Sequence, residues 1–477
     1  MVSGGCYMKI KSIPSVWIEK NGYRFDCNPY MGGAVETRVI LASLKRKSPP
    51  LSSLVSGRHG GIYHAGRYKR IWVGSKSHGT SFLSSRDVLQ SDLSKLNFIS
   101  NKSISDNQKL LVHENQILIT RSGTIGRMSY VNSFMSGMSC TEHVMRVEVD
   151  ELKVGSGYLY AFLNSKYGMP MVLEGTYGAM IQHIEPEHLE NMPIPRLGDR
   201  IETEIDNLIK DAAQLRSDFQ KKIDEATDLL FSSSGLRDIT PEEWHNAGPD
   251  IGDQIYLKTN RSLRALNFCG RFRRLLDNLK SVPHKVLGDI CEGGQLSSGA
   301  RFKRIDADRE HGVQLIGQKQ GFWSKPEGRW ISASHAPEGI FAKDEAVMIA
   351  SQGTLGEREV FCRPIFVTGR WLDYVYTQHF LRVSSSDLDV SGAYLYAFLR
   401  SETAFRCLRS MSIGSKQQDI HIGMLSELPI PVIEWEDKKK VEALIREAFQ
   451  AKDKADEYEN QAVAMVESEI RAAARTH

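Results

Sequence analysis

Tyr158-Leu-Tyr-Ala-Phe-Leu163 recurs unchanged as Tyr394-Leu-Tyr-Ala-Phe-Leu399, 236 residues further along the chain. The same separation relates the whole stretch His143–Pro195 to His379–Pro431 without a gap. Solenoid repeats have periods of about 20–50 residues, so a period this long indicates a whole folded domain together with the segment that follows it. The sequence therefore predicts one domain that is present twice.

The match continues towards the start of each copy with small changes in separation. Arg67-Tyr-Lys-Arg-Ile71 pairs with Arg301-Phe-Lys-Arg-Ile305, and Ile119-Thr-Arg-Ser-Gly-Thr-Ile-Gly126 pairs with Ile349-Ala-Ser-Gln-Gly-Thr-Leu-Gly356. Residues that agree between the copies are mostly apolar, Gly or Pro, whereas many polar residues beside them differ. This division is expected of one scaffold that presents two distinct recognition surfaces.

The composition is that of an ordinary soluble protein. The chain has 477 residues, of which 41% are hydrophobic and 25% charged, and this length allows two or three domains. No run approaches the roughly 18 apolar residues of a membrane span, and the first residues lack the pattern of a signal peptide. We therefore expect a cytoplasmic protein with no membrane partner.

Each copy is expected to have a mixed α+β fold. Gln116–Thr120 and His143–Val149 show the alternation and β-branched residues of strands, and Tyr158–Asn164 has the length of a short buried helix. Pro193 and Pro195 then end the regular structure.

A long helix is predicted from Asp199 to about Phe231, with Asp199 as its N-cap and Glu202 completing a capping box. Its apolar residues recur mostly in alternating steps of four and three, which is typical of a coiled-coil seam. They are Ile201, Ile205, Leu208, Ala212, Leu215, Phe219, Ile223, Ala226 and Leu230. At about 1.5 Å per residue this helix would be roughly 50 Å long, which is more than a globular core requires.

A second long helix begins near Glu436 and has a thinner seam that is richer in alanine. Because small residues allow close approach, we expect the two helices to pack against each other as a coiled coil. Because each helix follows its module in the same way, we expect the pair to be antiparallel. The predicted ranges are 1–198 for the first module, 199–235 for its helix, 236–435 for the second module and 436–477 for its helix.

The net charge of +3 is unevenly distributed. Asp199–Ser232 contains nine acidic and five basic residues, and Glu436–Arg471 contains ten acidic and seven basic ones. The rest of the chain therefore carries a charge of +10, which makes the modules the candidates for binding an anionic partner.

Signatures of catalysis and of metal binding are weak. Cys27-Asn-Pro-Tyr30 lacks the second proline of an adenine-methyltransferase loop, and no Gly-x4-Gly-Lys-Ser/Thr phosphate loop occurs. His183, Glu185 and His188 form a possible metal cluster, but the second copy does not repeat it, and no cysteine lies in a Cys-x-x-Cys pair. We predict no catalytic residue, no metal and no cofactor.

Three loops in each module combine basic, amide, hydroxyl and aromatic residues that suit phosphates and base edges. For the glycines among them we favour tight turns after a buried strand, and for the flanking polar residues we favour contact with a ligand. The candidate DNA-binding residues of the first module are Lys69, Arg70, Arg121, Ser122, Thr124, Arg127, Tyr177 and Gln182. Those of the second are Lys303, Arg304, Ser351, Gln352, Thr354, Arg358, Lys416, Gln417 and Gln418.

The order of these motifs resembles the specificity (S) subunit of type I restriction-modification systems. The resemblance covers essentially the whole chain and consists of two variable modules, each with an Ile-x-x-x-Gly-Thr-Ile/Leu-Gly string, a later Gly-x-x-x-Gln-x-Ile, a Pro-Ile-Pro exit and a long heptad helix. Members of that family commonly continue the exit with a Pro-Pro run, whereas this chain has Arg196-Leu-Gly-Asp199 and Val432-Ile-Glu-Trp435.

The resemblance implies a non-catalytic subunit whose modules are target recognition domains, each reading half of a bipartite site in double-stranded DNA. The helices would set the gap between the half-sites and dock two modification subunits that methylate adenine, and a restriction and motor subunit would join them. Two alternatives remain open, a protein-interaction scaffold that does not bind DNA and a self-sufficient DNA methyltransferase.

Overall fold

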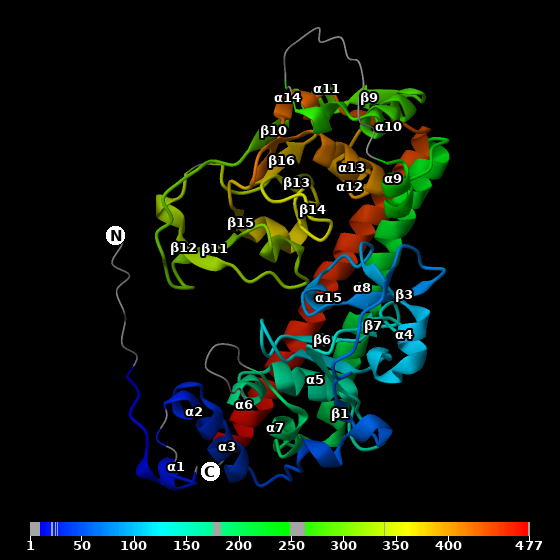
Figure 1. Cartoon of the computed structure of the whole chain (residues 1–477). Helices are drawn as coiled ribbons and strands as arrows, with labels where there is room; N and C mark the ends of the chain where they lie inside the picture. Colours follow the sequence, from blue (N-terminus) through cyan, green and yellow to red (C-terminus); the bar gives the residue numbers. More distant parts are fainter. Residues whose placement is uncertain are drawn as a thin grey trace. The chain divides into compact units, whose positions relative to one another are not determined.

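Two compact units divide the chain in this computed structural model (Figure 1). The first comprises Met1–Leu89, Leu96–Ser217 and Ala455–His477, and the second comprises Gln90–Lys95 and Asp218–Lys454. The structure describes residues 10–475 apart from 21, 24, 26, 175–182, 249–261, 263 and 338. Each unit contains half of each long helix, so the module and helix ranges derived from the sequence stay predictions.

The first unit contains two four-stranded sheets. One is antiparallel, with strand order β1-β8-β5-β6. Its strands are β1 (Ile62–Tyr63), β8 (Val144–Val147), β5 (Ile117–Thr120) and β6 (Met128–Tyr130). The other has the order β2-β4-β3-β7, in which β3 and β7 are parallel. Its strands are β2 (Trp72–Val73), β4 (Asn97–Ser100), β3 (Gly79–Leu83) and β7 (Ser139–Cys140).

The second unit repeats this arrangement. Its antiparallel sheet has the order β10-β16-β13-β14, with β10 (Gln295–Ser298), β16 (Phe380–Ser384), β13 (Ala346–Ala350) and β14 (Pro364–Val367). A three-stranded sheet pairs β12 (Arg329–Ser332) with β11 (Gly312–Ile316) and β11 in parallel with β15 (Val375–Tyr376). Two small pairs complete it, namely β17 (Ser412–Gly414) with β18 (Gln418–Ile420) and β9 (His284–Val286) with β19 (Pro429–Pro431).

Short helices surround these sheets. The first unit has α1 (Ser15–Lys20), α2 (Asn28–Met31), α3 (Ala34–Ser43), α4 (Asn101–Asp106), α5 (Ser156–Asn164), α6 (Gly168–Glu174) and α7 (Pro186–Glu190). The second has α9 (Pro241–Asn246), α10 (Gly270–Lys280), α11 (Leu287–Ile290), α12 (Gly392–Leu399), α13 (Glu402–Ser410) and α14 (Ile422–Leu425).

The repeated Tyr-Leu-Tyr-Ala-Phe-Leu sequence forms α5 in one unit and α12 in the other, as predicted. All six of its side chains are buried in each copy, and large hydrophobic residues occupy every face of the helix. A helix of this kind is stable only where other elements cover it on all sides. The identical sequences therefore mark the centre of each hydrophobic core.

The same helix is tied to the Pro-Ile-Pro exit in each unit. The Tyr158 hydroxyl donates a hydrogen bond to the carbonyl oxygen of Pro195, and the Tyr394 hydroxyl donates one of 2.8 Å to that of Pro431. Both bonds are buried. Without these donors, the two proline carbonyls would be left unsatisfied inside the core.

We expect Tyr158→Phe and Tyr394→Phe each to lower the free energy of unfolding by about 1–3 kcal/mol, because each change leaves a buried carbonyl without a donor. Chemical denaturation monitored by circular dichroism would measure the loss. The exposed Tyr23 supplies the matched control, and Tyr23→Phe should leave stability unchanged. Equal stability of all three variants would contradict this account.

Two long helices follow the modules, α8 from Asp199 to Ser233 and α15 from Trp435 to Arg475. Both lie where the spacing of apolar residues predicts a helix. Asp199 is not the N-cap that the sequence suggested, because it lies in the first turn and its side chain is exposed. Glu202 instead accepts the backbone N–H groups of Leu197 and Gly198 at 2.6 and 3.2 Å, and it also pairs with Arg196.

Within the first unit, α8 and α15 share a buried ionic cluster. The guanidinium of Arg216 lies 2.8 Å from the carboxylate of Asp456 and 2.6 Å from that of Glu459. Glu459 also accepts a hydrogen bond of 3.0 Å from the Tyr160 hydroxyl of α5. The helices are therefore held to each other and to the core of that unit.

Within the second unit, the two helices also lie side by side (Figure 1). The rings of Phe219 and Phe449 are 5.3 Å apart, and the Ser233 hydroxyl donates to Asp437 at 2.9 Å. Partners on α15 move towards its start as those on α8 move towards its end, which is an antiparallel course. The seam residues Val441, Ile445 and Ala448 are fully buried in the core of this unit.

We expect Arg216→Ala to lower the free energy of unfolding of the first unit by about 3–5 kcal/mol, because it removes the cation that the carboxylates of Asp456 and Glu459 both contact in a largely buried place. Hydrogen exchange would locate the loss in α5 and in residues 455–475. Arg200→Ala, at the exposed start of α8, is a control that should leave exchange there unchanged. A variant of Arg216 as stable as the parent would contradict the assignment.

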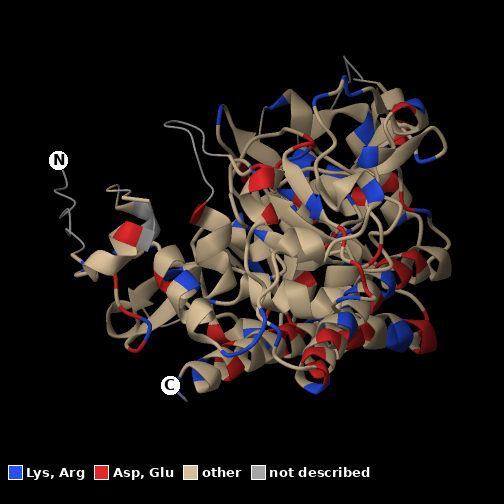
Figure 2. Ribbon diagram, turned by 90° about the horizontal axis from the view of Figure 1, so that it is seen from below, with Lys and Arg blue, Asp and Glu red and all other residues tan. Residues whose placement is uncertain are grey.

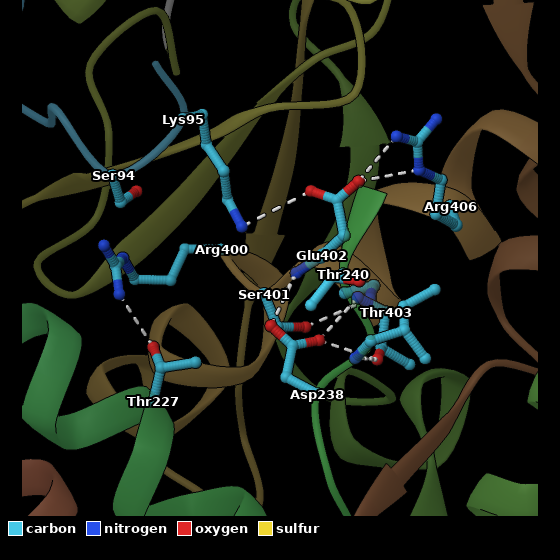
Figure 3. Close-up of polar contacts among 12 residues, drawn as sticks. Ser94, Lys95, Thr227, Asp238, Thr240, Arg400, Ser401, Glu402, Thr403 and Arg406 are labelled. Atoms are coloured by element: carbon cyan, nitrogen blue, oxygen red, sulfur yellow. Dashed lines mark hydrogen bonds and ion pairs between the residues drawn. The ribbon is translucent and has the colours of Figure 1, made fainter. Parts of the chain in front are cut away.

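The segment Gln90–Lys95 lies within the sequence of the first module but packs in the second unit. Asp92 pairs with the buried Arg400 at 3.1 Å, and Asp224 of α8 pairs with the same guanidinium at 2.7 Å. Burial opposes ionisation of Asp92, but Arg400 holds the pKa of its carboxyl below the ordinary value. Lys95 contacts Glu402 at 3.4 Å (Figure 3).

Candidate nucleic-acid interface

Glu142 and His143 connect β7 to β8 in the first unit, and two of the predicted loops meet there. The backbone N–H of Arg121 donates to the carbonyl of His143 at 3.0 Å, and the Ser122 hydroxyl lies 2.8 Å from Nδ1 of His143. Arg70, from the first basic segment, reaches the neighbouring Glu142. Residues far apart in the sequence are thereby brought to one place.

Arg70 is held by a carboxylate. One nitrogen of its guanidinium lies 2.9 and 2.8 Å from the two carboxylate oxygens of Glu142 and 3.2 Å from the Thr141 hydroxyl. Partial burial opposes ionisation of Glu142, but the hydrogen bonds from Arg70 keep the pKa of this carboxyl below its ordinary value. The pair is therefore ionised at neutral pH, and the charge of Arg70 is compensated inside the protein.

Ile184 and Glu185, which follow the third predicted loop of the first module, contact Arg121. Its Nε donates to the carbonyl of Ile184 at 3.0 Å, its guanidinium pairs with Glu185, and its own carbonyl accepts from the N–H of Ile184 at 3.1 Å. Glu185 and His188 form the capping box of α7, which accounts for two of the three residues considered as a metal cluster. Among the described residues no group suited to a metal ion was found.

The equivalent junction of the second unit is Gln378 and His379, between β15 and β16. The N–H and the hydroxyl of Ser351 donate to the carbonyl of His379 at 2.9 and 2.8 Å. Arg304 lies 3.5 Å from the side-chain oxygen of Gln378. The basic segment and the glycine loop thus meet at the same position of both modules.

The hairpin β17–β18 adds the third segment. Gly353 and Gln418 exchange backbone hydrogen bonds of 3.2 and 2.7 Å, and the Gln352 amide reaches Asp419 at 3.3 Å. The turn of the hairpin leaves Lys416 and Gln417 exposed beside the glycine loop. In the second unit, contacts with the junction and the hairpin therefore bring together the loops around residues 304, 352 and 416.

The predicted residues differ in how far they are available to a ligand. Exposed side chains are those of Lys69, Thr124, Lys303, Thr354, Arg358, Lys416 and Gln417. Half-buried ones are those of Arg70, Arg127, Arg304 and Gln352. Buried ones are those of Arg121, Ser122, Ser351 and Gln418. Tyr177 and Gln182 lie outside the described residues.

The glycines of these loops are explained by the backbone, as one reading of the sequence proposed. Gly123 and Gly126 have φ values of 81° and 79°, which L side chains rarely adopt. A Cβ on Gly353 would instead approach Cβ of Phe361 to 2.9 Å. The first loop therefore needs glycine for its conformation, and the second needs it for close packing.

Helix α13 supports the glycine loop of the second unit. Arg406 forms two contacts of 2.8 Å with the carboxylate of Glu357, and Arg409 donates to the carbonyl of Gly356 at 2.8 Å. The start of α13 is fixed in turn, because Asp238 accepts the N–H groups of Glu402 and Thr403 at 2.9 and 2.7 Å (Figure 3). The loop is therefore positioned by buried cations behind it.

In the first unit the loop is supported by apolar packing. A Cβ on Gly126 would lie 2.7 Å from Leu173 and 3.6 Å from Met169, both of which belong to α6. The exchange of Arg127 for Glu357 between the copies therefore has an internal cause, since Glu357 pairs with Arg406. This difference does not by itself mark a recognition residue.

Several residues of this surface were missed by the sequence analysis. Glu142, Gln378 and Gln318 were not singled out, although Gln318 brackets the backbone of Gln352 with contacts of 2.8 and 3.3 Å. Glu142 and Gln378 directly precede His143 and His379, the first residues of the ungapped repeat. This position was the signal in the sequence that could have indicated them. Their junction role depends on the pairing of strands that are distant in the sequence.

Charge is spread differently over the helices and the loops. Acidic and basic residues occur together along the long helices (Figure 2). Among the described charged residues at exposed positions of the loops that meet near residues 142 and 378, cations predominate. They are Arg67, Lys69, Arg301, Lys303, Arg358 and Lys416, beside the single acid Glu357. None of the described helices has the length and hydropathy needed to span a membrane.

We expect Arg121→Ala to destabilise the first unit by about 2–4 kcal/mol, because it removes the donor to the buried carbonyl of Ile184 and the cation that pairs with Glu185. Lys416→Ala should leave stability within about 0.5 kcal/mol of the parent, since Lys416 is exposed. Thermal unfolding of the two variants would measure the difference. Loss of stability in the Lys416 variant, with none in the Arg121 variant, would reverse these assignments.

Comparisons with known proteins gave the following findings. No protein-family model matches the chain, and no curated protein matches it either. A type I restriction-modification S subunit from M. genitalium is similar over 89% of this chain and 94% of its own, with 13% identity and a TM-score of 0.30. The HsdS subunit from Thermoanaerobacter tengcongensis covers 85% of this chain and 98% of its own, with 11% identity and a TM-score of 0.26.

A chain from a structure of type I restriction-modification complex assembly and conformational transition covers 85% of this chain and 99% of its own, with 11% identity and a TM-score of 0.24. Identities and TM-scores this low establish no equivalence of individual residues.

Proposed function

We propose that this protein is the DNA-recognition subunit of a type I restriction-modification complex and reads a bipartite site with its two modules. The observation that carries the proposal is the duplicated junction. In each unit a basic segment and a glycine loop, far apart in the sequence, meet at the same point, at Glu142 in one copy and at Gln378 in the other.

The chemistry of this surface suits duplex DNA. Exposed Lys and Arg side chains favour phosphates, whereas the amides of Gln352 and Gln417 suit base edges. Because the scaffold is the same and the polar side chains differ, the two modules would read different sequences. A bipartite and asymmetric site is the expected result.

The long helices have a separate role in this proposal. They would pair as an antiparallel coiled coil, set the separation of the two half-sites and dock two methyltransferase subunits. A restriction and motor subunit would complete the assembly. The chain itself would contribute recognition, and its partners would contribute adenine methylation and cleavage.

Selection of random duplexes by the purified full chain would test the proposal. We expect two conserved sequence blocks separated by a constant number of bases, and binding that weakens steeply between about 50 and 200 mM salt. A single block, or binding that does not depend on salt, would contradict it and favour a protein-interaction scaffold. Methyl transfer by the chain alone would favour a self-sufficient methyltransferase.

Lys416→Ala should change or weaken only one of the two blocks, by about three- to tenfold. Lys440→Ala is the matched control, because Lys440 is an exposed lysine of α15 that pairs with Asp437 at 2.9 Å. It should leave both blocks unchanged. Equal weakening of all sequences by the Lys416 variant would identify that residue as a phosphate contact instead.

A further inference from the structure

Arg70 and Arg304 occupy equivalent positions, yet their surroundings differ in charge. Arg70 contacts both oxygens of Glu142 at 2.8 and 2.9 Å. At the position of Glu142 the second copy has Gln378, whose oxygen lies 3.5 Å from Arg304. Among the described residues no ion pair joins Arg304 to a carboxylate. One arginine is thus neutralised internally, and the other is not.

The backbone contacts next to residues 142 and 378 are the same in both modules, so the difference in charge is confined to the side chains. The residue after Glu142 is His143, and the residue after Gln378 is His379, and each accepts the first backbone N–H of a glycine loop, from Arg121 at 3.0 Å and from Ser351 at 2.9 Å. The backbone contacts beside residues 142 and 378 are therefore alike. Exchange of one carboxylate for an amide is the main change in charge beside the guanidinium.

Both guanidinium groups remain within reach of an external anion. The side chain of Arg70 is 31% exposed, whereas that of Glu142 is 14% exposed, so the arginine lies nearer to solvent than its partner. Arg304 is also half-buried. A phosphate oxygen would meet an arginine already bound to a carboxylate in one module and an uncompensated arginine in the other.

We propose that residues 142 and 378 set the phosphate affinity of their modules, with Glu142 competing with a DNA phosphate for Arg70 and Gln378 leaving Arg304 available to one. This inference rests on the proposed DNA-binding function. It assigns unequal shares of the electrostatic affinity to two modules of the same fold. Binding by the first module would therefore be weaker and would depend less on salt.

Counterion release determines how strongly the salt dependence of DNA binding should change. Each phosphate neutralised by a protein cation releases condensed counterions and contributes about 0.9 to the slope of log K against log salt concentration. In the first module, the internal carboxylate already balances the cation, so a phosphate contact there releases less. Removing that carboxylate should restore one full contact.

Reciprocal exchanges in the full-length protein test this inference. The probe is a fluorescent duplex of about 30 base pairs and mixed sequence, titrated from about 50 to 200 mM potassium chloride. Glu142→Gln should raise affinity about three- to tenfold at the lowest salt and steepen the slope by about 0.9. Gln378→Glu should do the opposite, and the two changes together should restore the parental behaviour.

Arg70→Gln distinguishes a specific pair from a general change of charge. If Glu142 acts through Arg70, Glu142→Gln should give no gain when Arg70 is already glutamine. Glu151→Gln changes the net charge by the same amount, but its partner Lys210 keeps a second carboxylate, that of Asp206 at 2.8 Å, so affinity should stay near the parental value. Unchanged thermal unfolding would show that each variant folds.

The outcomes separate the inference from the function on which it rests. The inference would be overturned, and DNA binding left intact, if Glu142→Gln raised affinity equally in the parental protein and in the Arg70→Gln variant. A gain in affinity no larger than that of Glu151→Gln would overturn it as well. Absence of salt-dependent binding by the parental protein would overturn both. Coupling between positions 70 and 142, with the reverse effect at 378, is the supporting result.

Discussion

The hydrogen bond from a buried tyrosine hydroxyl to the last proline carbonyl of each module is the constraint on which the remaining structure depends. Tyr158 and Tyr394 belong to helices that are apolar on every face, so their polar atoms need partners inside the core. The partner in each case is the chain that leads into a long helix. The centre of each module is thereby fixed to its exit.

The starts of the two repeated helices are satisfied by different groups, and only in the first copy does that group belong to a long helix. The N–H of Gly157, at the start of α5, donates to Asp206 of α8 at 2.7 Å. In the other copy the hydroxyl of Ser391 accepts the N–H of Tyr394 at 3.2 Å. A side-chain oxygen accepts a backbone N–H at the start of both helices. It belongs to a carboxylate in the first copy and to a hydroxyl in the second.

Much of the fold was predictable, because its signals are local and repeated. The six-residue repeat, the strands before and after the glycine loops, and the long helices follow from periodicity and composition. Asp199 was assigned wrongly as an N-cap, because the rule considers residue type and not the backbone geometry of the preceding Gly198. The pairing of strands and the placement of Gln90–Lys95 depend on contacts between distant residues, which one sequence does not reveal.

The candidate site was predictable at the level of loops rather than side chains. Sequence reasoning selected segments that do meet, but it could not separate exposed Lys416 from buried Arg121, since both are cations in variable positions. The carboxylates that accompany Arg70 and Arg121 lie elsewhere in the sequence. A cation that pairs with a carboxylate of the protein stabilises the fold, whereas an exposed cation without such a partner can bind a ligand.

The position of Gln90–Lys95 limits how the two halves of this chain could be exchanged with those of a related two-module protein. The segment is encoded within the first half of the chain, yet Asp92 partners Arg400 and thus belongs to the second unit. A chimaera joined at the linker would inherit Arg400 from one parent and residue 92 from the other. The two halves are consequently not independent cassettes, and successful recombinants would have to carry a compatible acid at that position.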